Sequence, residues 1–341
     1  MSKIISQYWR LDKRPKNEIE DNCLSLHKEE IAFPEEGEIL FRVIYLSLDA
    51  TNRLWMGDME ELYIAPVPLG EPMYGFVLVE AIESRNDKFK KGDLAIGLAT
   101  WSEYIISDGS NFTPFPKPNG FPLEAAFGVL AVAGPTAYFG LLDIGQPKAG
   151  ETVVVTAAAG AVGSLVGQIA KMKGCHVVGL AGSEEKCRWL TDELGFDAAI
   201  NYKKENMLEA LKKHCPDGID VHFENVGGEV LEAALTLMNL KGRIVVCGLI
   251  SMYNKDMRQS GPRMFHNTIM KRLRIEGFVV LDYADRFPEA HAVLSQWMQT
   301  GRLKYRLDIA EGIESSVNSL RRLYSGANNG KMMVRYSPAP E

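Results

Sequence analysis

The segment TVVVTAAAGAVGSLVGQIAK, residues 152–171, constrains the fold more than any other stretch. A short apolar strand runs into a turn of small residues, and a helix with apolar periodicity follows. In a dinucleotide fingerprint the first glycine makes the tight turn, the second lets the backbone approach the pyrophosphate, and the third allows close helix–strand packing. Gly160 and Gly163 occupy the second and third places, whereas Ala158, which is tolerated if its φ is negative, occupies the first. The segment predicts a dinucleotide-binding turn, with a purely structural turn as the alternative.

Strand-like and helix-like segments alternate through the second part of the chain, which indicates βαβ units and a doubly wound parallel sheet. In contrast, the first 125 or so residues hold short apolar runs separated by Gly and Pro, which is typical of a β-rich unit. The last ~35 residues lose the alternating rhythm, and we expect them to return to the first unit. The expected strands of the parallel sheet are 152–156, 176–181, 198–201, 219–224, 242–248 and 273–280.

Composition narrows the class of protein and its location. A chain of 341 residues exceeds the length at which a single core usually stops growing, so two domains are expected. The net charge of −6 and the lack of a long basic run argue against nucleic acid as a partner. Five widely spaced cysteines without a C-x-x-C pair favour a reducing compartment. No signal-peptide core and no apolar run of membrane-spanning length is present, so we expect a cytoplasmic protein that does not bind membranes.

The end of the second expected strand bears on the choice of cofactor. NAD sites usually carry Asp or Glu there to hold the ribose 2′-hydroxyl, but this chain has Gly182 and Ser183. The missing carboxylate leaves room for a 2′-phosphate, with Lys186 and Tyr202 as candidate partners. The following pair of glutamates, 184–185, is the counter-argument, because two carboxylates would repel a phosphate unless they point away. We therefore favour NADP(H), with NAD as the alternative.

No metal site is expected. The six histidines show no metal-ligand spacing with one another or with cysteine, and a four-cysteine structural cluster is missing. Alcohol oxidation by the usual zinc route would thus lack its Lewis acid, whereas hydride transfer to an already polarised acceptor needs none.

Four longer segments carry a family resemblance: AAAGAVGSLVGQIAKMKGCHVVGLAGSEEK, LGFDAAINYK, DGIDVHFENVGG and GRIVVCGLISMYN. They closely resemble the zinc-independent branch of the medium-chain dehydrogenase/reductase superfamily, and within it the NADP-dependent alkenal/one oxidoreductases. TAYFGLLDIG, EGFVV and NNGK extend the resemblance over nearly the whole chain. It implies a GroES-like, β-rich catalytic domain made of residues 1–125 and 305–341, and a Rossmann NADP-binding domain of residues 126–304. It also implies a homodimer formed largely through the nucleotide-binding domains.

The same resemblance assigns cofactor contacts motif by motif. It places the 2′-phosphate at Lys186 and Tyr202, in agreement with the argument from the missing carboxylate. Asn329 would reach the cofactor from the catalytic domain. The remaining implied cofactor residues are Gly160, Ala161, Val162 and Gly163 in the pyrophosphate turn, Asn225, the loop of Cys247, Gly248, Leu249, Ile250, Ser251 and Tyr253, and the trio Phe278, Val279 and Val280.

The implied reaction is NADPH-dependent reduction of the C=C bond of α,β-unsaturated aldehydes and ketones. Hydride adds to the β-carbon, and we expect Tyr253 to donate a hydrogen bond to the substrate or its enolate, with water as the alternative proton source. A quinone reductase of the same superfamily and a non-enzymatic NADPH-binding protein are the competing hypotheses. Candidate walls of the substrate pocket, for each of which core packing is the competing interpretation, are Asn52, Trp55, Met73, Tyr74 and Trp101.

Two short motifs depart from the better-known members of the branch. Their D-P-Y-M-R becomes DATNR at 49–53, so Thr51 replaces a tyrosine associated with the substrate pocket. Their G-M-T-A-Y becomes GPTAY at 134–138. The first change leaves the identity of the substrate open, and the second is expected to alter a loop near the nicotinamide.

Overall fold

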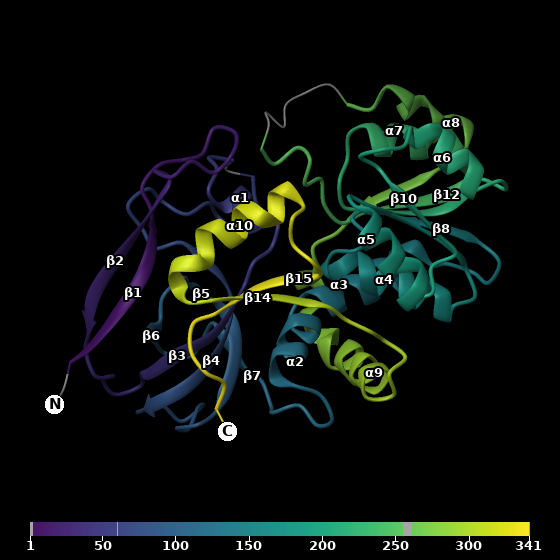
Figure 1. Ribbon diagram of the computed structural model, residues 1–341. Helices are drawn as coiled ribbons and strands as arrows, with labels where there is room; N and C mark the ends of the chain where they lie inside the picture. Colours follow the sequence, from purple (N-terminus) through teal and green to yellow (C-terminus); the bar gives the residue numbers. More distant parts are fainter. Residues whose placement is uncertain (1–2, 60, 255–260, 341) are drawn as a thin grey trace. The chain divides into compact units, whose positions relative to one another are not determined.

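The computed structural model describes residues 3–59, 61–254 and 261–340, and in it the chain forms two units (Figure 1). One unit comprises Met1–Phe127 and Leu307–Glu341, and the other comprises Gly128–Arg306. The boundaries expected from the sequence, after residues 125 and 304, lie two residues before those of the structure. The main sheets of the two units are separate.

The second unit is built on six parallel strands. They are β8 (Thr152–Val155), β9 (His176–Ala181), β10 (Ala198–Asn201), β11 (Ile219–Glu224), β12 (Met238–Val246) and β13 (Arg274–Gly277). Their order in the sheet is β10-β9-β8-β11-β12-β13, and each neighbouring pair is parallel. Counted from β8, this is the order 3-2-1-4-5-6 of dinucleotide-binding folds, in which the topology reverses between the first and fourth strands. The doubly wound parallel sheet expected from the alternating pattern is confirmed.

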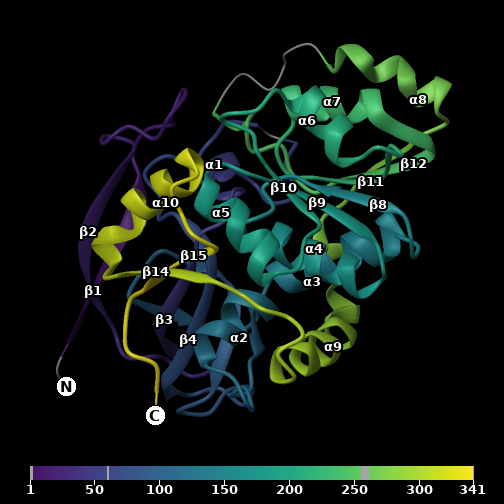
Figure 2. The same cartoon turned by 45° about the vertical axis from the view of Figure 1, so that its right-hand side comes forward.

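Helices cover both faces of this sheet (Figures 1 and 2). On one face, Val154 and Ile244 share a buried cluster with Leu211 of α6 (Met207–His214) and Ala234 of α7 (Glu229–Leu237). α3 (Ala133–Phe139), its continuation η1 (Gly140–Gly145), α4 (Ala161–Met172) and α9 (Phe287–Gln299) pack together on the other face. β8, β9 and β11 are buried on both faces, which explains why their sequences are largely apolar. The shorter helical segments are α5 (Glu184–Arg188), η2 (Trp189–Glu193), η3 (Arg263–His266), α8 (Asn267–Met270) and η4 (Val280–Arg286).

The first unit is β-rich. Its seven-stranded sheet follows the order β14-β15-β3-β4-β5-β7, with β6 paired to β3, and β1 and β2 form a separate two-stranded sheet. β15 pairs antiparallel with β3, with Met333 opposite Ser47, so the end of the chain completes a sheet begun near its start. The strands are β1 (Ile4–Leu11), β2 (Leu24–Ile31), β3 (Ile39–Ser47), β4 (Tyr74–Ser84), β5 (Leu94–Thr100), β6 (Tyr104–Ser107), β7 (Phe112–Pro114), β14 (Leu307–Glu311) and β15 (Lys331–Arg335).

Besides the strands, this unit holds α1 (Asn52–Trp55), the 3₁₀ turn η5 (Ile313–Ser315) and α10 (Ser316–Ser325), while α2 (Leu123–Leu130) runs across the division after Phe127. The stretch Leu123–Gly145, which begins with α2, is the one described helical segment whose length and composition would allow it to cross a membrane. Of its most apolar window, 83% is buried inside the protein. Burial of this extent is what the core helix of a globular protein shows.

Candidate functional site

The predicted cofactor residues of the second unit all follow the carboxyl ends of its parallel strands. This edge is where ligands bind in open α/β sheets, at the point where the strand order reverses. The structure therefore brings six segments, predicted separately, to one edge of one sheet. Gly160–Gly163 follow β8, Gly182 and Ser183 follow β9, Tyr202 follows β10, Asn225 follows β11, Cys247–Tyr253 follow β12, and Phe278–Val280 follow β13.

In the turn after β8, the backbone conformation and the close packing of the helix explain the glycines at 160 and 163. Gly160 caps α4 with an extended backbone, at φ −86° and ψ −178°. A Cβ atom on Gly163 would lie 2.5 Å from the carbonyl oxygen of Ala157, so only glycine allows the helix to pack this closely. Ala158 is not among the residues with positive φ, whereas Ala157 is, at 47°. The alanine in the first fingerprint place is thus unstrained, and the turn suits a pyrophosphate held by backbone N–H groups at a helix start.

The ends of β9 and β10 form the expected phosphate subsite. The phenol oxygen of Tyr202 lies 2.8 Å from the position that a Cβ atom on Gly182 would take. Burial raises the pKa of Tyr202, so its phenol keeps the proton that a donor to phosphate needs. The hydroxyl of Ser183 caps α5 by accepting from the backbone N–H of Lys186 at 3.2 Å. Lys186 is thereby placed in the first turn of α5.

Glu184, one of the two carboxylates that argued against a phosphate here, already has partners. Its Oε1 accepts from Nδ2 of the buried Asn201 at 2.9 Å and lies 3.3 Å from Nζ of Lys204. The hydrogen bond from Asn201, followed by the contact with Lys204, lowers the pKa of Glu184. The carboxylate is ionised but paired, so its repulsion of a phosphate is reduced.

Hydrogen bonds hold the loop after β12, both to the segment after β11 and within the loop itself. The hydroxyl of Ser251 donates to the carbonyl of Val226 at 2.6 Å, and the backbone N–H of Leu249 donates to the phenol oxygen of Tyr253 at 3.1 Å. The phenol, which we expect to be a donor, therefore uses one acceptor position within its own loop. Burial, together with the charge of Glu224, raises the pKa of Cys247 to about 12, so this thiol stays protonated at neutral pH.

The candidate substrate walls lie in the core of the first unit. Trp55, Met73 and Trp101 are fully buried in one hydrophobic cluster. Tyr74 is half-buried, its ring centroid lies 5.2 Å from that of Trp55, and its hydroxyl donates to the carbonyl of Ala65. The structure thus brings these aromatic residues together, and their contact with a substrate stays a prediction.

Two predicted residues of the first unit have structural partners of their own. Asn52 is buried, and its Oδ1 accepts from the backbone N–H of Asp49 at 2.7 Å. The backbone N–H of Asn329, which precedes β15, donates to Asp308 at 2.9 Å. Both predicted roles, at the substrate and at the cofactor, stay predictions.

The sequence did not single out Tyr63. Its phenol oxygen lies 2.7 Å from Oγ1 of Thr51, the residue that replaces a tyrosine of the family motif. The side chain of Tyr63 is half exposed. A tyrosine twelve positions from Thr51 gives no periodic signal in the sequence. Only the tertiary structure shows that the phenol of Tyr63 lies next to Thr51, where the family motif has its own tyrosine.

Within residues 3–59, 61–254 and 261–340, no group of three or more His, Cys, Asp or Glu side chains could hold a metal ion. His222 is fully buried on β11 and pairs with Glu224 at 2.9 Å. His291 is partly buried against the carbonyl of Leu130 at 2.8 Å, and burial lowers its pKa.

Comparison with known proteins gives this site a context. A family model described as the N-terminal domain of oxidoreductase matches residues 7–115, and one described as zinc-binding dehydrogenase matches residues 161–296. The NADPH-dependent curcumin reductase of Escherichia coli is 41% identical over 332 residues, which is 96% of each chain. The NADP(+)-dependent 2-alkenal reductase of Nicotiana tabacum is 43% identical over 302 residues, or 88% of each chain.

Among solved structures, CurA of Vibrio vulnificus in complex with NADPH superposes with a TM-score of 0.91 at 40% identity. The match covers 98% of this chain and 100% of that one. An Escherichia coli quinone oxidoreductase complexed with NADPH has a TM-score of 0.77 at 19% identity, which supports the shared fold alone. The chain belongs to the medium-chain dehydrogenase/reductase superfamily, in the branch of the alkenal/one oxidoreductases.

Proposed function

We propose that this protein uses NADPH to reduce the C=C bond of α,β-unsaturated aldehydes and ketones. One observation carries the proposal: the second strand of the dinucleotide-binding sheet is followed by Gly182, covered by the phenol of Tyr202, where an NAD site usually has a carboxylate. The relatives named for curcumin and 2-alkenals support the choice of substrate class, and the Vibrio structure with NADPH supports the cofactor.

The residues at the carboxyl edge fit an NADPH molecule. Backbone N–H groups of Gly160–Gly163 would hold the pyrophosphate at the start of α4. Lys186 and Tyr202 would hold the 2′-phosphate, while Asn225, the 247–253 loop and Phe278–Val280 would line the remainder. We also propose Asn329 as a cofactor contact, as the family resemblance implies. NADPH, when bound, supplies the hydride that reaches the β-carbon of the substrate.

The chain's own contribution to the chemistry is to position the enone and to stabilise the oxygen that becomes negative. Hydride addition at the β-carbon moves charge onto the carbonyl oxygen, and a phenol is suited to donate a hydrogen bond there. We assign this donation to Tyr253. The α-carbon then takes a proton from Tyr253 or from water. The half-buried ring of Tyr74, which packs against the buried Trp55, would offer an apolar surface to the substrate.

We propose that the reaction proceeds without a metal ion. The described residues offer no cluster of ligands, so polarisation of the carbonyl would rest on hydrogen-bond donors. Activity that survives prolonged chelation, with no stoichiometric metal in elemental analysis, is the expected result; activity lost on chelation and restored by zinc would overturn it. All five cysteines are free thiols, which fits the cytoplasmic location that we also propose.

We further propose a homodimer that forms through the edge of the parallel sheet. β13 has a paired strand on one side, β12, and no other described strand pairs with it. Close to it in the chain, Phe265, Ile269 and Met270 are 56%, 72% and 60% exposed, an apolar surface that a second copy would cover. Sedimentation should give twice the mass of 37.9 kDa, and Ile269→Asp should shift the protein toward the monomer. A wild-type monomer at micromolar concentration would contradict the proposal.

The decisive assay combines purified protein and NADPH with a panel of enones, alkenals and quinones, followed by absorbance at 340 nm and by product analysis. The saturated carbonyl compound is the expected product. Turnover of quinones alone, with hydroquinone or semiquinone as the product, would favour a quinone reductase. NADPH binding without turnover of any acceptor would favour a non-enzymatic role.

A further inference from the structure

A fully buried carboxylate, Glu224, ends the strand next to the reversal of the sheet order. Its Oε1 accepts from the hydroxyl of Thr156 at 2.9 Å and from the backbone N–H groups of Val226 at 2.6 Å and Gly227 at 3.0 Å. Its Oε2 lies 2.9 Å from Nε2 of His222. A buried charge is tolerated only when such donors surround it. Burial alone would raise the pKa of Glu224, but the contacts with His222 and the backbone N–H groups outweigh it and lower the pKa.

Thr156 connects this carboxylate to the pyrophosphate turn. The residue follows β8 directly and precedes the strained Ala157. Its hydroxyl accepts from the backbone N–H of Asn225 at 2.7 Å, and its carbonyl accepts from Nδ2 of the same asparagine at 2.8 Å. The segments that leave β8 and β11 are therefore joined through side chains as well as through the sheet.

The third cofactor segment, the loop 247–253, is hydrogen-bonded to the backbone of Glu224 and Asn225. The carbonyl of Glu224 accepts from the backbone N–H groups of Cys247 at 2.9 Å and Gly248 at 3.1 Å. The carbonyl of Asn225 accepts from the N–H of Ile250 at 3.1 Å. The loop 247–253 thus depends for its position on where Glu224 and Asn225 lie.

We propose that Thr156 and Glu224 are positioning residues that hold three cofactor-binding segments, after β8, β11 and β12, in the arrangement that receives NADPH. Neither residue needs to touch the cofactor, because both act through the turn at 157–163 and through Asn225. The donors named above all come from the chain itself, so they can hold this arrangement without help from NADPH and reduce the ordering cost of binding. The inference rests on the proposed NADPH site.

Two substitutions of Thr156 provide the test. Thr156→Val keeps the shape but removes the hydroxyl, so Glu224 loses one of its donors and the N–H of Asn225 loses its side-chain acceptor. Because hydrogen bonds to charged groups are among the stronger ones, we expect the Kd for NADPH to rise about tenfold or more. Thr156→Ser restores the hydroxyl, and its Kd should stay within about threefold of wild type. Fluorescence titration of each purified variant with NADPH gives Kd, and a thermal melt gives Tm.

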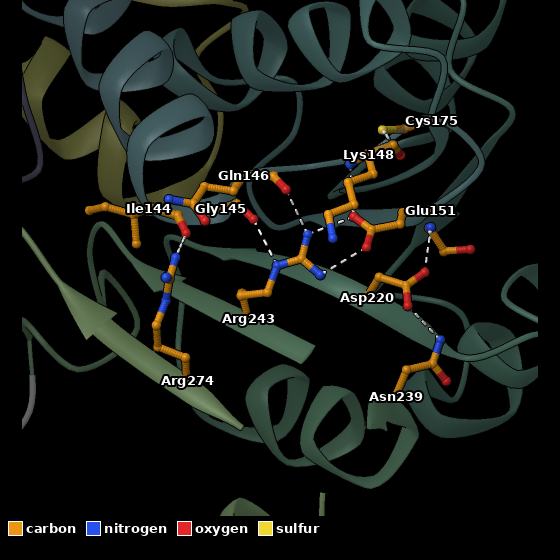
Figure 3. Close-up of polar contacts among 11 residues, drawn as sticks. Ile144, Gly145, Gln146, Lys148, Glu151, Cys175, Asp220, Asn239, Arg243 and Arg274 are labelled. Carbon is orange, nitrogen blue, oxygen red and sulfur yellow. Dashed lines mark hydrogen bonds and ion pairs between the residues drawn. The ribbon is translucent and has the colours of Figure 1, made fainter. Parts of the chain in front are cut away.

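Asp220 supplies a matched control at the other end of β11. Its carboxylate lies on the same face of the strand as Glu224 and accepts from the backbone N–H of Thr152 at 2.9 Å and from Nδ2 of Asn239 at 2.8 Å (Figure 3). This contact lies at the amino edge of the sheet, away from the cofactor segments. Asp220→Asn should lower Tm as Thr156→Val does, yet leave the Kd for NADPH unchanged.

The outcomes separate a positioning role from a general effect on stability. A raised Kd in Thr156→Val, restored in Thr156→Ser and absent in Asp220→Asn, supports the proposal. Equal losses of Tm in Thr156→Val and Asp220→Asn with unchanged Kd in both would overturn it. If Thr156→Val does not fold, Glu224→Gln, which keeps size and one carbonyl oxygen, should show the same rise in Kd, and an unchanged Kd there would overturn the proposal. A wild-type protein that binds no NADPH would instead overturn the cofactor site itself.

Discussion

The phenol of Tyr202 covers the backbone of Gly182, with 2.8 Å between its oxygen and the position of an added Cβ. A side chain at residue 182 would therefore meet the phenol, and a carboxylate there would also repel the 2′-phosphate. Gly182→Asp should raise the KM for NADPH more than about tenfold while the KM for NADH stays similar or falls. Gly182→Ala separates the clash from the charge and should affect both cofactors to a similar, smaller extent. Steady-state kinetics with both cofactors checks this, and equal losses in Gly182→Asp would contradict the assignment.

The contact between Thr51 and Tyr63 predicts an effect on substrates rather than on the cofactor. Thr51→Val removes the hydroxyl that lies 2.7 Å from the phenol oxygen, and the exposed Tyr63 side chain loses this contact. We expect the KM for a bulky enone to change about threefold to tenfold, with the KM for NADPH unchanged. Tyr63→Phe should reproduce the effect, because it breaks the same contact from the other side. Unchanged enone kinetics in both variants would show that this pair does not shape the substrate site.

Backbone strain before the pyrophosphate turn gives a prediction about stability. Ala157 has a φ of 47°, a left-handed conformation that costs an L-residue about 1 kcal/mol. Ala157→Gly should therefore raise the free energy of unfolding by up to about 1 kcal/mol, since glycine adopts this conformation freely. Its neighbour Ala158 has no positive φ, so Ala158→Gly should lower the free energy by about 0.5–1 kcal/mol. Urea denaturation gives the free energy of unfolding of both variants. A less stable Ala157→Gly together with a more stable Ala158→Gly would refute the backbone strain at Ala157.

An ion pair at the amino edge of the parallel sheet, between Arg243 and Glu151, predicts how stability depends on pH. Arg243 donates to Glu151 through Nη1 at 3.1 Å and Nη2 at 2.6 Å, and it also donates to the carbonyls of Gly145 and Gln146 (Figure 3). Burial would raise the pKa of Glu151, but the hydrogen bonds from Arg243 and from the N–H of Lys148 outweigh it and lower the pKa.

Because the folded pKa lies below the unfolded value near 4.5, the stabilisation is complete above that pH and is lost as the pH falls through the folded pKa. Glu151→Gln should lower the free energy of unfolding at pH 7 by about 2 kcal/mol, and the difference from wild type should shrink below about pH 4.5. Denaturant melts at several pH values measure it. The exposed Glu209, paired with Lys212 at 2.9 Å, is the control, and Glu209→Gln should cost less than about 0.5 kcal/mol. A pH-independent loss in Glu151→Gln would contradict the account.

Much of the parallel sheet was predictable from residues alone. The strands at 176–181, 198–201 and 219–224 begin and end where the sequence predicts, because buried apolar runs are bounded by turn residues. β12 begins at Met238, four residues before the predicted start, because Met238 already pairs with Ile219; the register then shifts, Lys241 has a positive φ of 61°, and regular pairing continues from Arg243. The helix expected at 262–271 is divided into η3 and α8, and the strand expected at 273–280 covers only Arg274–Gly277.

The first unit was harder to predict. β1 and β2 pair from Ile4 with Ile31 to Leu11 with Leu24, but the strands carry many polar residues and a long connection separates them. No short turn marks this hairpin, so the local pattern predicts neither strand.

At the candidate site, the sequence predicted which segments carry the cofactor residues but not what holds them. Glu184 accepts from Asn201, seventeen residues away in the sequence, and Thr156 donates at 2.9 Å to Glu224 at the end of the neighbouring strand. Such pairs depend on the order of the strands, which periodicity does not encode. The family resemblance named Lys186 and Tyr202, and the structure adds a physical reason why Glu184 does not exclude a phosphate.

Transfer of deuterium tests the central claim most directly. NADPH labelled with deuterium at C4 of the nicotinamide, in each of its two stereoisomers, is incubated with the protein and an enone in ordinary water, and the product is examined by mass spectrometry and NMR. The account predicts a saturated carbonyl compound with deuterium at the β-carbon from one of the two labelled cofactors and a solvent proton at the α-carbon. An allylic alcohol labelled at the former carbonyl carbon, or a product without label from either cofactor, would contradict it.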